Sequence, residues 1–254
     1  MRADIFVAGE RGISRAKSAE LIKAGKVRVG GVLLAKPSQE IDISNLNYEE
    51  SAEFSPRHVA KLKVEIDSEI YVGRGAIKLK GFLDQIKFEI PLKTALDVGA
   101  STGGFTQALL LSGAASVVAL DVGVGQLDAS LRADERVEAR EGCDVRDYAR
   151  DYVGEGFDVV VADVSFIPLA LVLPAINKLA KNDIIMLFKP QFEVGRAAKR
   201  TKKGVVVESK EIERARIKFE SECAALGWRL RASENCVITG KEGNLERFYH
   251  YTKI

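Results

Sequence analysis

From residue 94 onward, short apolar segments alternate with longer segments of helical periodicity, and this feature limits the possible folds more than any other. The apolar segments are 94–98, 116–122, 136–140, 157–163 and 183–189. The helical segments lie near 104–113, 124–131, 168–180 and 208–226. Strands that are apolar throughout are typical of parallel sheets with helices on both faces. The pattern predicts an α/β fold with a doubly wound, Rossmann-like sheet, and two final antiparallel strands at 228–239 and 246–253.

Residues 1–50 show a different pattern, which predicts a small α+β domain. We expect a short helix at 2–8 and a second helix that begins after Ser14, a favourable N-cap residue, and ends at Gly25. The apolar residues that follow are interrupted by Gly30-Gly31, which is typical of a β-hairpin.

The segment between the two patterns is expected to be a linker. Residues 51–73 contain Pro56 and show no clear hydrophobic period. A helix from Arg74 to about Ile86 then opens the second domain, which spans 74–254.

Charge is distributed unevenly along the chain. Residues 1–36 contain eight Lys and Arg against three Asp and Glu, whereas residues 97–170 contain thirteen acidic and five basic side chains. Five more basic residues lie within 196–203, a loop that we expect to be mobile until a polyanion neutralises it. The asymmetry indicates that the basic segments hold a polyanion, although solvated faces without a partner are an equally good reading of charge alone.

Several classes of protein are excluded by what the sequence lacks. Cys143, Cys223 and Cys236 are far apart and form no Cys-x-x-Cys pair, which excludes a disulfide scaffold or zinc ribbon and fits a reducing cytoplasm. With His58 and His250 as the only histidines, a histidine-based metal site has almost no ligands available. There is neither an apolar run of about 18–20 residues nor an apolar secretion signal at the start. We therefore expect a cytoplasmic protein with no metal and no membrane span.

A glycine-rich loop follows the first predicted strand of the sheet and opens a helix. Such a loop lets a ligand approach the backbone, and the helix N-terminus offers N–H groups to an anion. Phe105 stands where the phosphate-binding lysine of a P-loop belongs, and Ala100-Ser101 after Gly99 break the dinucleotide pattern G-x-G-x-x-G. The loop is therefore suited to a smaller anionic group, such as the carboxylate of an amino acid.

Two acidic residues extend this prediction to a whole cofactor. Asp121 ends the second strand, where a carboxylate accepts hydrogen bonds from ribose hydroxyls, and Asp144 follows the third strand, near the place of an adenine. Together they favour S-adenosylmethionine over an ordinary tight turn. The predicted cofactor-binding residues are Asp97, Gly99, Ala100, Ser101, Thr102, Gly103, Gly104, Phe105, Asp121, Val122, Asp144, Val145 and Asp163.

Two further polar residues end apolar strands and are candidates for chemistry. Asp163 ends the fourth strand and Lys189 the fifth, so both should face the same crevice as the glycine-rich loop. Desolvation and a neighbouring cation are the two effects that convert a lysine into a base near neutral pH. The alternative is a strand-end lysine that simply reaches water.

These motifs, taken in order, resemble those of the TlyA family of ribosomal-RNA 2′-O-methyltransferases, historically called hemolysin A. The likeness covers nearly the whole chain. It is carried by Ser14-Arg15 to Val29, Gly73-Arg74-Gly75-Ala76-Ile77-Lys78-Leu79, Gly99 to Phe105, Ala162-Asp163-Val164-Ser165-Phe166-Ile167, Lys189-Pro190-Gln191-Phe192-Glu193-Val194-Gly195 and Gly243-Asn244-Leu245-Glu246. The resemblance implies a catalytic domain of the FtsJ/RrmJ type and an N-terminal RNA-binding domain similar to that of ribosomal protein S-four.

The resemblance also implies a catalytic tetrad, which falls on Lys78, Asp163, Lys189 and Glu246. Lys189 would accept the proton of a ribose 2′-OH, Asp163 would orient it, Lys78 would steady the oxyanion, and Glu246 would hold either Lys78 or the ribose in place. The implied donor is S-adenosylmethionine without a metal, and the substrate is ribosomal RNA, a cytidine of the large subunit for chains of this shorter form. The predicted RNA-binding residues are Arg2, Arg11, Arg15, Lys17, Lys23, Lys26, Arg28, Arg74, Arg196, Lys199, Arg200, Lys202 and Lys203.

Three other functions compete with this one. A non-catalytic RNA-binding or ribosome-assembly protein would be expected to lose a member of the tetrad, and none is lost. A membrane-lytic hemolysin would need an apolar or amphipathic insertion segment, and we find none. A small-molecule methyltransferase would leave the basic N-terminal domain unexplained. The oligomeric state is left open.

Overall fold

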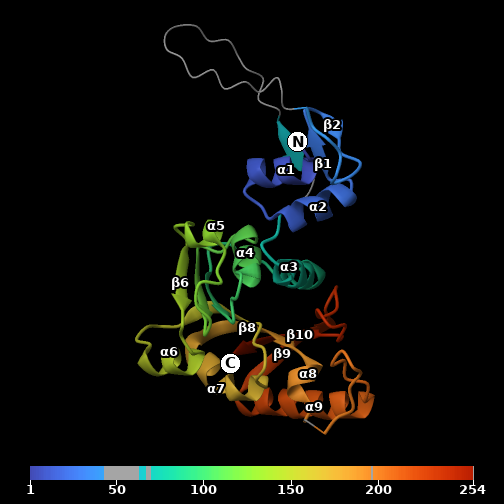
Figure 1. The fold of residues 1–254 in the computed structure, drawn as a ribbon. Helices are drawn as coiled ribbons and strands as arrows, with labels where there is room; N and C mark the ends of the chain where they lie inside the picture. The colour runs from blue at the N-terminus through green and yellow to red at the C-terminus, as the bar shows by residue number, and fades with distance from the viewer. Residues whose placement is uncertain (43–62, 67–69, 196, 254) are drawn as a thin grey trace. The chain divides into compact units, whose positions relative to one another are not determined.

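The computed structural model describes residues 1–42, 63–66, 70–195 and 197–253. It divides into two compact units, residues 1–70 and 71–254, which are described separately below (Figure 1). The predicted linker, residues 51–73, lies largely outside the described residues.

The first unit contains two helices and a small sheet. The elements are α1 (Ala3–Arg11), α2 (Arg15–Lys23), β1 (Val27–Val29), β2 (Val32–Leu33) and β3 (Val64–Ile66), with the strands in the order β2-β1-β3. Ser14 caps α2 as predicted, since its Oγ accepts a hydrogen bond from the Lys17 backbone N–H at 3.2 Å. The first helix is longer than the predicted 2–8 because the chain remains helical up to Gly12, which has a φ of 63°.

The strand β3 corrects the linker prediction for residues 64–66. It pairs antiparallel with β1, where Val64 lies opposite Val29 and Ile66 opposite Val27. These two apolar residues flank Glu65 and pack on the small core of this unit. Three alternating residues are too few to give a visible period, so the sequence pattern could not reveal this strand.

The second unit is built on a seven-stranded sheet in the order β6-β5-β4-β7-β8-β10-β9. The strands are β4 (Thr94–Val98), β5 (Ser116–Asp121), β6 (Val137–Glu141), β7 (Phe157–Ala162), β8 (Ala180–Phe188), β9 (Trp228–Asn235) and β10 (Arg247–Lys253). The first five strands run parallel, and β10 is antiparallel to both of its neighbours. The predicted α/β sheet with an antiparallel final pair is confirmed.

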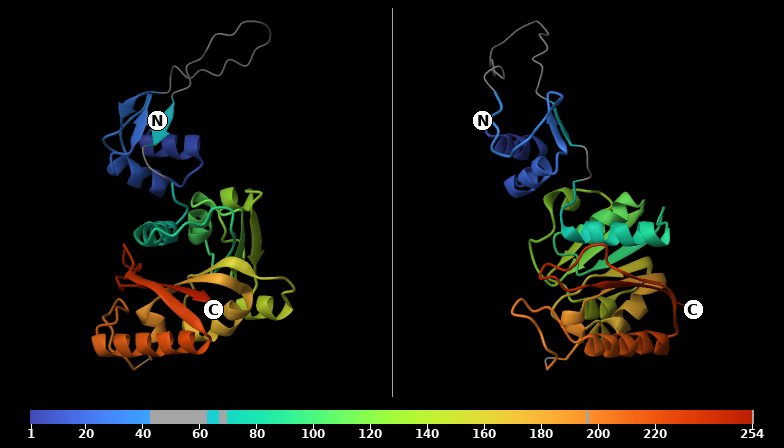
Figure 2. Two further views of the ribbon diagram at one scale, coloured as in Figure 1. Left: turned by 180° about the vertical axis from the view of Figure 1, so that it is seen from behind. Right: turned by 90° about the vertical axis from the view of Figure 1, so that its right-hand side faces the viewer.

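Helices cover both faces of this sheet (Figure 2). They are α3 (Arg74–Ile86), α4 (Gly104–Leu111), α5 (Ala129–Arg132), α6 (Val145–Asp151), the 3-10 turn η1 (Leu169–Leu171), α7 (Leu173–Leu179), α8 (Pro190–Glu193) and α9 (Ser209–Ala225). The core on one face includes α3 and α4 residues, and the core on the other includes α7 and α9 residues. Along β4, Leu96 belongs to one core and Ala95 to the other, as expected of a doubly covered strand.

The helix predicted at 124–131 is wrong for its first half. Only Ala129–Arg132 are helical, because a side chain holds the preceding turn in an irregular shape. Glu141 Oε1 accepts hydrogen bonds from the backbone N–H groups of Gln126 (2.7 Å) and Leu127 (2.9 Å). Among the described residues, no helix combines the length and the apolar character needed to cross a bilayer.

Candidate active site

A cavity lies at the carboxyl ends of β4, β5 and β7. At this point the strand order reverses, because β5 and β6 lie on one side of β4 and β7 lies on the other. This main cavity has a volume of about 390 Å³. Its lining residues include Gly99, Ser101, Asp121, Val122, Gln126, Cys143, Asp144, Val145, Asp163, Ser165, Phe166, Ile167 and Val172. A second cavity of about 210 Å³ shares Gly99, Ser101, Asp163 and Ser165 with it and is also lined by Gly75, Ala100, Thr102, Gly104, Phe105 and Lys189.

Asp121 fixes the glycine-rich loop that separates the two cavities. One of its oxygens accepts a hydrogen bond from the Ser101 N–H at 2.8 Å, and the other accepts one from the Gly123 N–H at 2.7 Å. Gly99, with a φ of 85°, passes close to the end of β7, where an added Cβ would lie 2.9 Å from the Asp163 carbonyl oxygen. A larger residue at position 99 would therefore push the loop away from Asp163.

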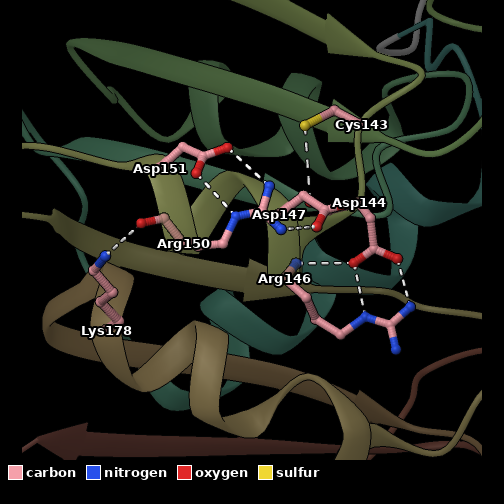
Figure 3. A network of polar contacts seen from close by, with 7 residues as sticks. All are labelled: Cys143, Asp144, Arg146, Asp147, Arg150, Asp151 and Lys178. Atoms are coloured by element: carbon pink, nitrogen blue, oxygen red, sulfur yellow. Dashed lines mark hydrogen bonds and ion pairs between the residues drawn. The ribbon is translucent and has the colours of Figure 1, made fainter.

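Asp144 lies in the wall of the main cavity but is already engaged with Arg146 (Figure 3). It caps α6 by accepting the Arg146 N–H at 2.8 Å, and its two oxygens accept from the same residue's guanidinium at 2.9 and 2.6 Å. The guanidinium hydrogen bonds lower the pKa of Asp144, with burial opposing them. The carboxyl is thus a charged acceptor whose position is fixed by its own helix.

Asp97 was predicted as a cofactor contact, but it lines neither cavity and lies fully buried behind the loop. Its Oδ2 accepts a hydrogen bond from Thr106 Oγ1 at 2.7 Å, while Oδ1 has no hydrogen-bond partner among the described residues. Burial raises the pKa of Asp97 to about 7, and the nearby charge of Asp163 adds to the effect.

This burial predicts a pH dependence of stability. Between about pH 4 and about pH 7 the folded chain keeps a proton on Asp97 that the unfolded chain has lost, so the stability falls as the pH rises. Relative to Asp97→Asn, the unfolding free energy of the wild-type chain should decrease in this window with a slope approaching about 1.4 kcal/mol per pH unit. Urea unfolding curves of both proteins measured from acid to neutral pH check this. Parallel pH profiles would contradict it.

Lys189 lies on the wall of the second cavity, directly after β8. Its Nζ lies 2.5 Å from Asp163 Oδ1 and donates a hydrogen bond to Ser165 Oγ at 2.8 Å. The lysine is buried, so the two partners determine where its amine points. Both partners come from the loop after β7 and line both cavities.

Lys78 and Glu246 form a second buried ion pair. Lys78 Nζ on α3 donates to Glu246 Oε2 at 2.5 Å, and the two residues are 8 % and 2 % exposed. The strand register brings this pair towards Lys189, since Arg247 pairs with Phe188 and the preceding Glu246 adjoins the position of Lys189. The buried Cys236 thiol supports this proximity, because the charges of Lys78, Glu246 and Asp163 all act on it. Its pKa is raised mainly by burial.

An exposed aromatic residue stands beside these groups. Phe166 is 88 % exposed, lines the main cavity, and has a φ of 68°, which a bulky residue adopts only under constraint. Its ring lies 5.2 Å from that of Phe192, whose ring in turn faces Lys189 Nζ at 5.9 Å. Sequence reasoning did not assign Phe166, Gln126 or Cys143 to the site. Their positions in strand-end loops were the available signal.

The predicted RNA-binding residues fall into two groups. Several are engaged with the protein itself: Arg2 and Arg15 donate to the buried Asp4 at 3.0 and 2.9 Å, Lys17 pairs with Glu20 at 3.3 Å, and Arg74 donates to the Thr239 carbonyl at 2.7 Å. The exposed predicted residues are Arg11, Arg15, Lys23, Lys26, Arg28, Arg74, Lys199, Lys202 and Lys203, of which Arg28 also donates to the Gly31 carbonyl at 3.4 Å. Arg196 lies outside the described residues.

Residues 199–207 form a hydrogen-bonded hairpin that contains four of the five basic residues of the predicted loop. Arg200 and Val206 form an antiparallel bridge, and the Thr201 N–H donates to the Val205 carbonyl at 2.8 Å. Arg200, predicted to bind RNA, donates to backbone carbonyls, including that of Ala198 at 2.8 Å. Backbone hydrogen bonds therefore give this turn a defined conformation, which the many positive charges in the sequence did not indicate.

A doubly wound sheet with a glycine-rich loop after its first strand, β4, and an acidic residue at the end of β5 is typical of enzymes that bind a nucleoside-containing cofactor. The family model of FtsJ-like methyltransferases matches residues 71–253. The chain belongs to this family and, within it, to the TlyA group, as the similarity to curated relatives shows.

Three relatives illustrate the likeness. The "23S rRNA (cytidine-2'-O)-methyltransferase TlyA" of Campylobacter jejuni is 44 % identical, and the match covers 100 % of both chains. The "16S/23S rRNA (cytidine-2'-O)-methyltransferase TlyA" of Mycobacterium tuberculosis is 41 % identical over 92 % of this chain and 83 % of its own. A solved structure from Streptococcus thermophilus that carries a hemolysin name is 31 % identical, covers 100 % of this chain and 88 % of its own, and has a TM-score of 0.67.

Proposed function

We propose that this methyltransferase transfers a methyl group from S-adenosylmethionine to the ribose 2′-OH of a cytidine in ribosomal RNA of the large subunit, in the cytoplasm. The observation that carries the proposal is the position of Lys189 on the wall of the second cavity, where it is held by Asp163 and Ser165, which line both cavities. The names of the relatives support the choice of substrate. A hemolytic role has no comparable support in the site.

The main cavity suits the nucleoside part of the donor. Its volume of about 390 Å³ is in the range of small-molecule sites, and Val122, Val145, Ile167 and Val172 give it an apolar lining. Asp121 would accept the ribose hydroxyls, and Asp144 would face the adenine edge. The glycine-rich loop would hold the methionine end. When bound, S-adenosylmethionine supplies an electrophilic methyl group that already carries its leaving group.

The second cavity then receives the ribose that is methylated. Lys189 loses one proton to solvent and, as the neutral amine, accepts the proton of the 2′-OH while the oxygen attacks the methyl group and the carbon–sulfur bond of the donor breaks. Asp163 and Ser165 keep the amine aligned for this step. Lys78, held by Glu246, contributes positive charge towards the developing oxyanion. The exposed ring of Phe166 offers a stacking surface to the unpaired base. No step requires a metal.

The proposal is tested by mapping 2′-O-methylated riboses in ribosomal RNA from cells with and without the gene. We expect one or a few cytidines of the large subunit to lose methylation in its absence, and purified protein with S-adenosylmethionine to restore it. An unchanged map, together with no transfer to unmethylated large subunits in vitro, would contradict the proposal.

The exposed lysines of the first unit should contribute to RNA affinity. Lys23 and Lys26 are exposed, and each phosphate contact adds about 0.7–0.9 to the slope of log affinity against log salt. Lys23→Gln/Lys26→Gln should therefore reduce this slope by about 1.5 and weaken binding at low salt. Lys63→Gln serves as the control, because Lys63 pairs with Glu65 at 3.0 Å in the same unit. A slope as steep as that of the wild type would count against this unit as the RNA anchor.

A further inference from the structure

The hairpin 199–207 carries three exposed cations. Lys199, Lys202 and Lys203 are exposed, and the turn is closed by the Gly204 N–H, which donates to the Thr201 carbonyl at 2.9 Å. A concentration of charge on an ordered turn is suited to an RNA backbone. The contacts between the hairpin and the rest of the unit therefore decide which residues would be affected when RNA binds to the hairpin.

The base of the hairpin is attached to the segment that follows Lys189. Arg200 donates from its guanidinium to the carbonyl oxygens of Val194 at 3.4 Å and Gly195 at 3.3 Å. These residues directly follow α8, which begins beside Lys189. The segment that carries Lys189 is therefore hydrogen-bonded to the hairpin.

The other side of the hairpin is attached to the loop that carries Glu246. Asn244, only 3 % exposed, accepts the Val206 N–H at its Oδ1 (3.0 Å) and donates from Nδ2 to the Gly204 carbonyl (3.4 Å). With these two bonds the side-chain amide pairs with the hairpin backbone. A mobile hairpin would break both of them.

Asn244 is coupled to Glu246 through the fold of this loop. The Asn244 carbonyl accepts the Gly240 N–H at 2.8 Å, and an added Cβ at Gly240 would lie 2.5 Å from Glu246 Oε1. The loop therefore encloses the carboxylate that holds Lys78. A change in how Asn244 sits on the hairpin alters the walls around Glu246.

We propose that Asn244 is a positioning residue that couples the docking of RNA phosphates on Lys199, Lys202 and Lys203 to the placement of Glu246 and Lys78. The inference rests on the proposed function and deepens it: RNA bound at the hairpin would complete the active site, so that the enzyme discriminates its polymeric substrate from small hydroxyl compounds. The side-chain amide, and not the charge of the hairpin alone, transmits the effect.

A double-mutant cycle on methyl transfer to unmethylated large ribosomal subunits tests the coupling. Asn244→Ala should lower kcat about 30-fold with little change in KM, and Lys202→Gln/Lys203→Gln should lower kcat about tenfold and raise KM. Combined, the substitutions should lower kcat about 30-fold rather than about 300-fold, because the lysines act on kcat through Asn244. Glu242→Ala, an exposed change in the same loop, is the control. Multiplicative losses of kcat, or a normal kcat for Asn244→Ala, would overturn the proposal.

Two further measurements separate coupling from misfolding and from failure of the proposed function. Asn244→Asp keeps an acceptor for Val206 but loses the donor to Gly204, and should give an intermediate loss of kcat at a temperature where thermal unfolding shows the variant to be fully folded, although it now buries a carboxylate. In the wild type, bound large subunits should slow hydrogen exchange at Gly240 and at Cys236, whose N–H donates to the Glu246 carbonyl at 2.9 Å. If the ribosomal subunit binds but hydrogen exchange at Gly240 and Cys236 does not slow, the proposed coupling is refuted. Protection without any methyl transfer would instead refute the proposed function.

Discussion

Lys189→Ala should lower the kcat of methyl transfer by about 10³-fold while leaving the affinity for S-adenosylmethionine within about threefold of the wild type. The amine is the group that removes the 2′-OH proton in our mechanism, and a positioned base contributes about 10²–10⁴-fold to such a step. The cofactor cavity keeps its shape because Lys189 does not line it. Single-turnover transfer to unmethylated large subunits, with calorimetric titration of the cofactor, measures both quantities.

Two variants separate the charge of Lys189 from its ability to accept a proton. Lys189→Arg retains the positive charge beside Asp163, but a guanidinium stays protonated in proteins, so the loss should be nearly as large. Ser165→Ala removes the hydrogen bond at 2.8 Å and leaves the ion pair, and should cost only about tenfold. Lys181→Gln, at the other end of β8, is the control. If Lys189→Arg kept most of the activity, Lys189 would act by charge and not as the base.

Much of the fold could be predicted because burial on both faces leaves a strong trace in the sequence. Val159, Val160, Val161 and Ala162 are all fully buried, so β7 appears as one continuous apolar run. The helix α3 was predicted with both of its ends correct, since its apolar residues keep the helical period up to Ile86. Elements that depend on a distant part of the chain left no such trace in the sequence. The turn before α5 depends on Glu141, and β3 depends on pairing with β1.

The site was predictable in its composition but not in its pairings. Strand ends indicated Asp163, Asp121 and Lys189, whereas the link between Lys78 and Glu246 came only from a family likeness. These two residues are 168 positions apart, and the antiparallel register of β10 on β8 decides where Glu246 lies. Charge counting also could not reveal that Arg2 and Arg15 stabilise the buried Asp4, whose pKa the Arg2 hydrogen bond lowers.

The ion pair between Lys78 and Glu246 should dominate the stability of the second unit among single charge changes. Lys78→Met leaves Glu246, which is 2 % exposed, without its cation, and breaking a buried pair in this way costs about 3–5 kcal/mol of unfolding free energy. Lys80→Met on the same helix removes a pair between Lys80 and Asp84 that is exposed to solvent, and should cost less than about 1 kcal/mol. Urea unfolding at neutral pH compares the two.

Removing both partners separates stability from catalysis at this pair. Lys78→Met/Glu246→Leu replaces two buried charges by apolar side chains of similar size, which is often neutral for stability, so most of the loss caused by Lys78→Met should be recovered. Methyl transfer should nevertheless remain at least about 10²-fold below the wild type, because the positive charge towards the oxyanion is gone. The loss in Lys78→Met alone should also shrink as the pH falls, since the isolated carboxylate can then take up a proton. A double variant that folded well and methylated normally would show that the pair is structural, and the catalytic charge would have to come from Lys189 alone.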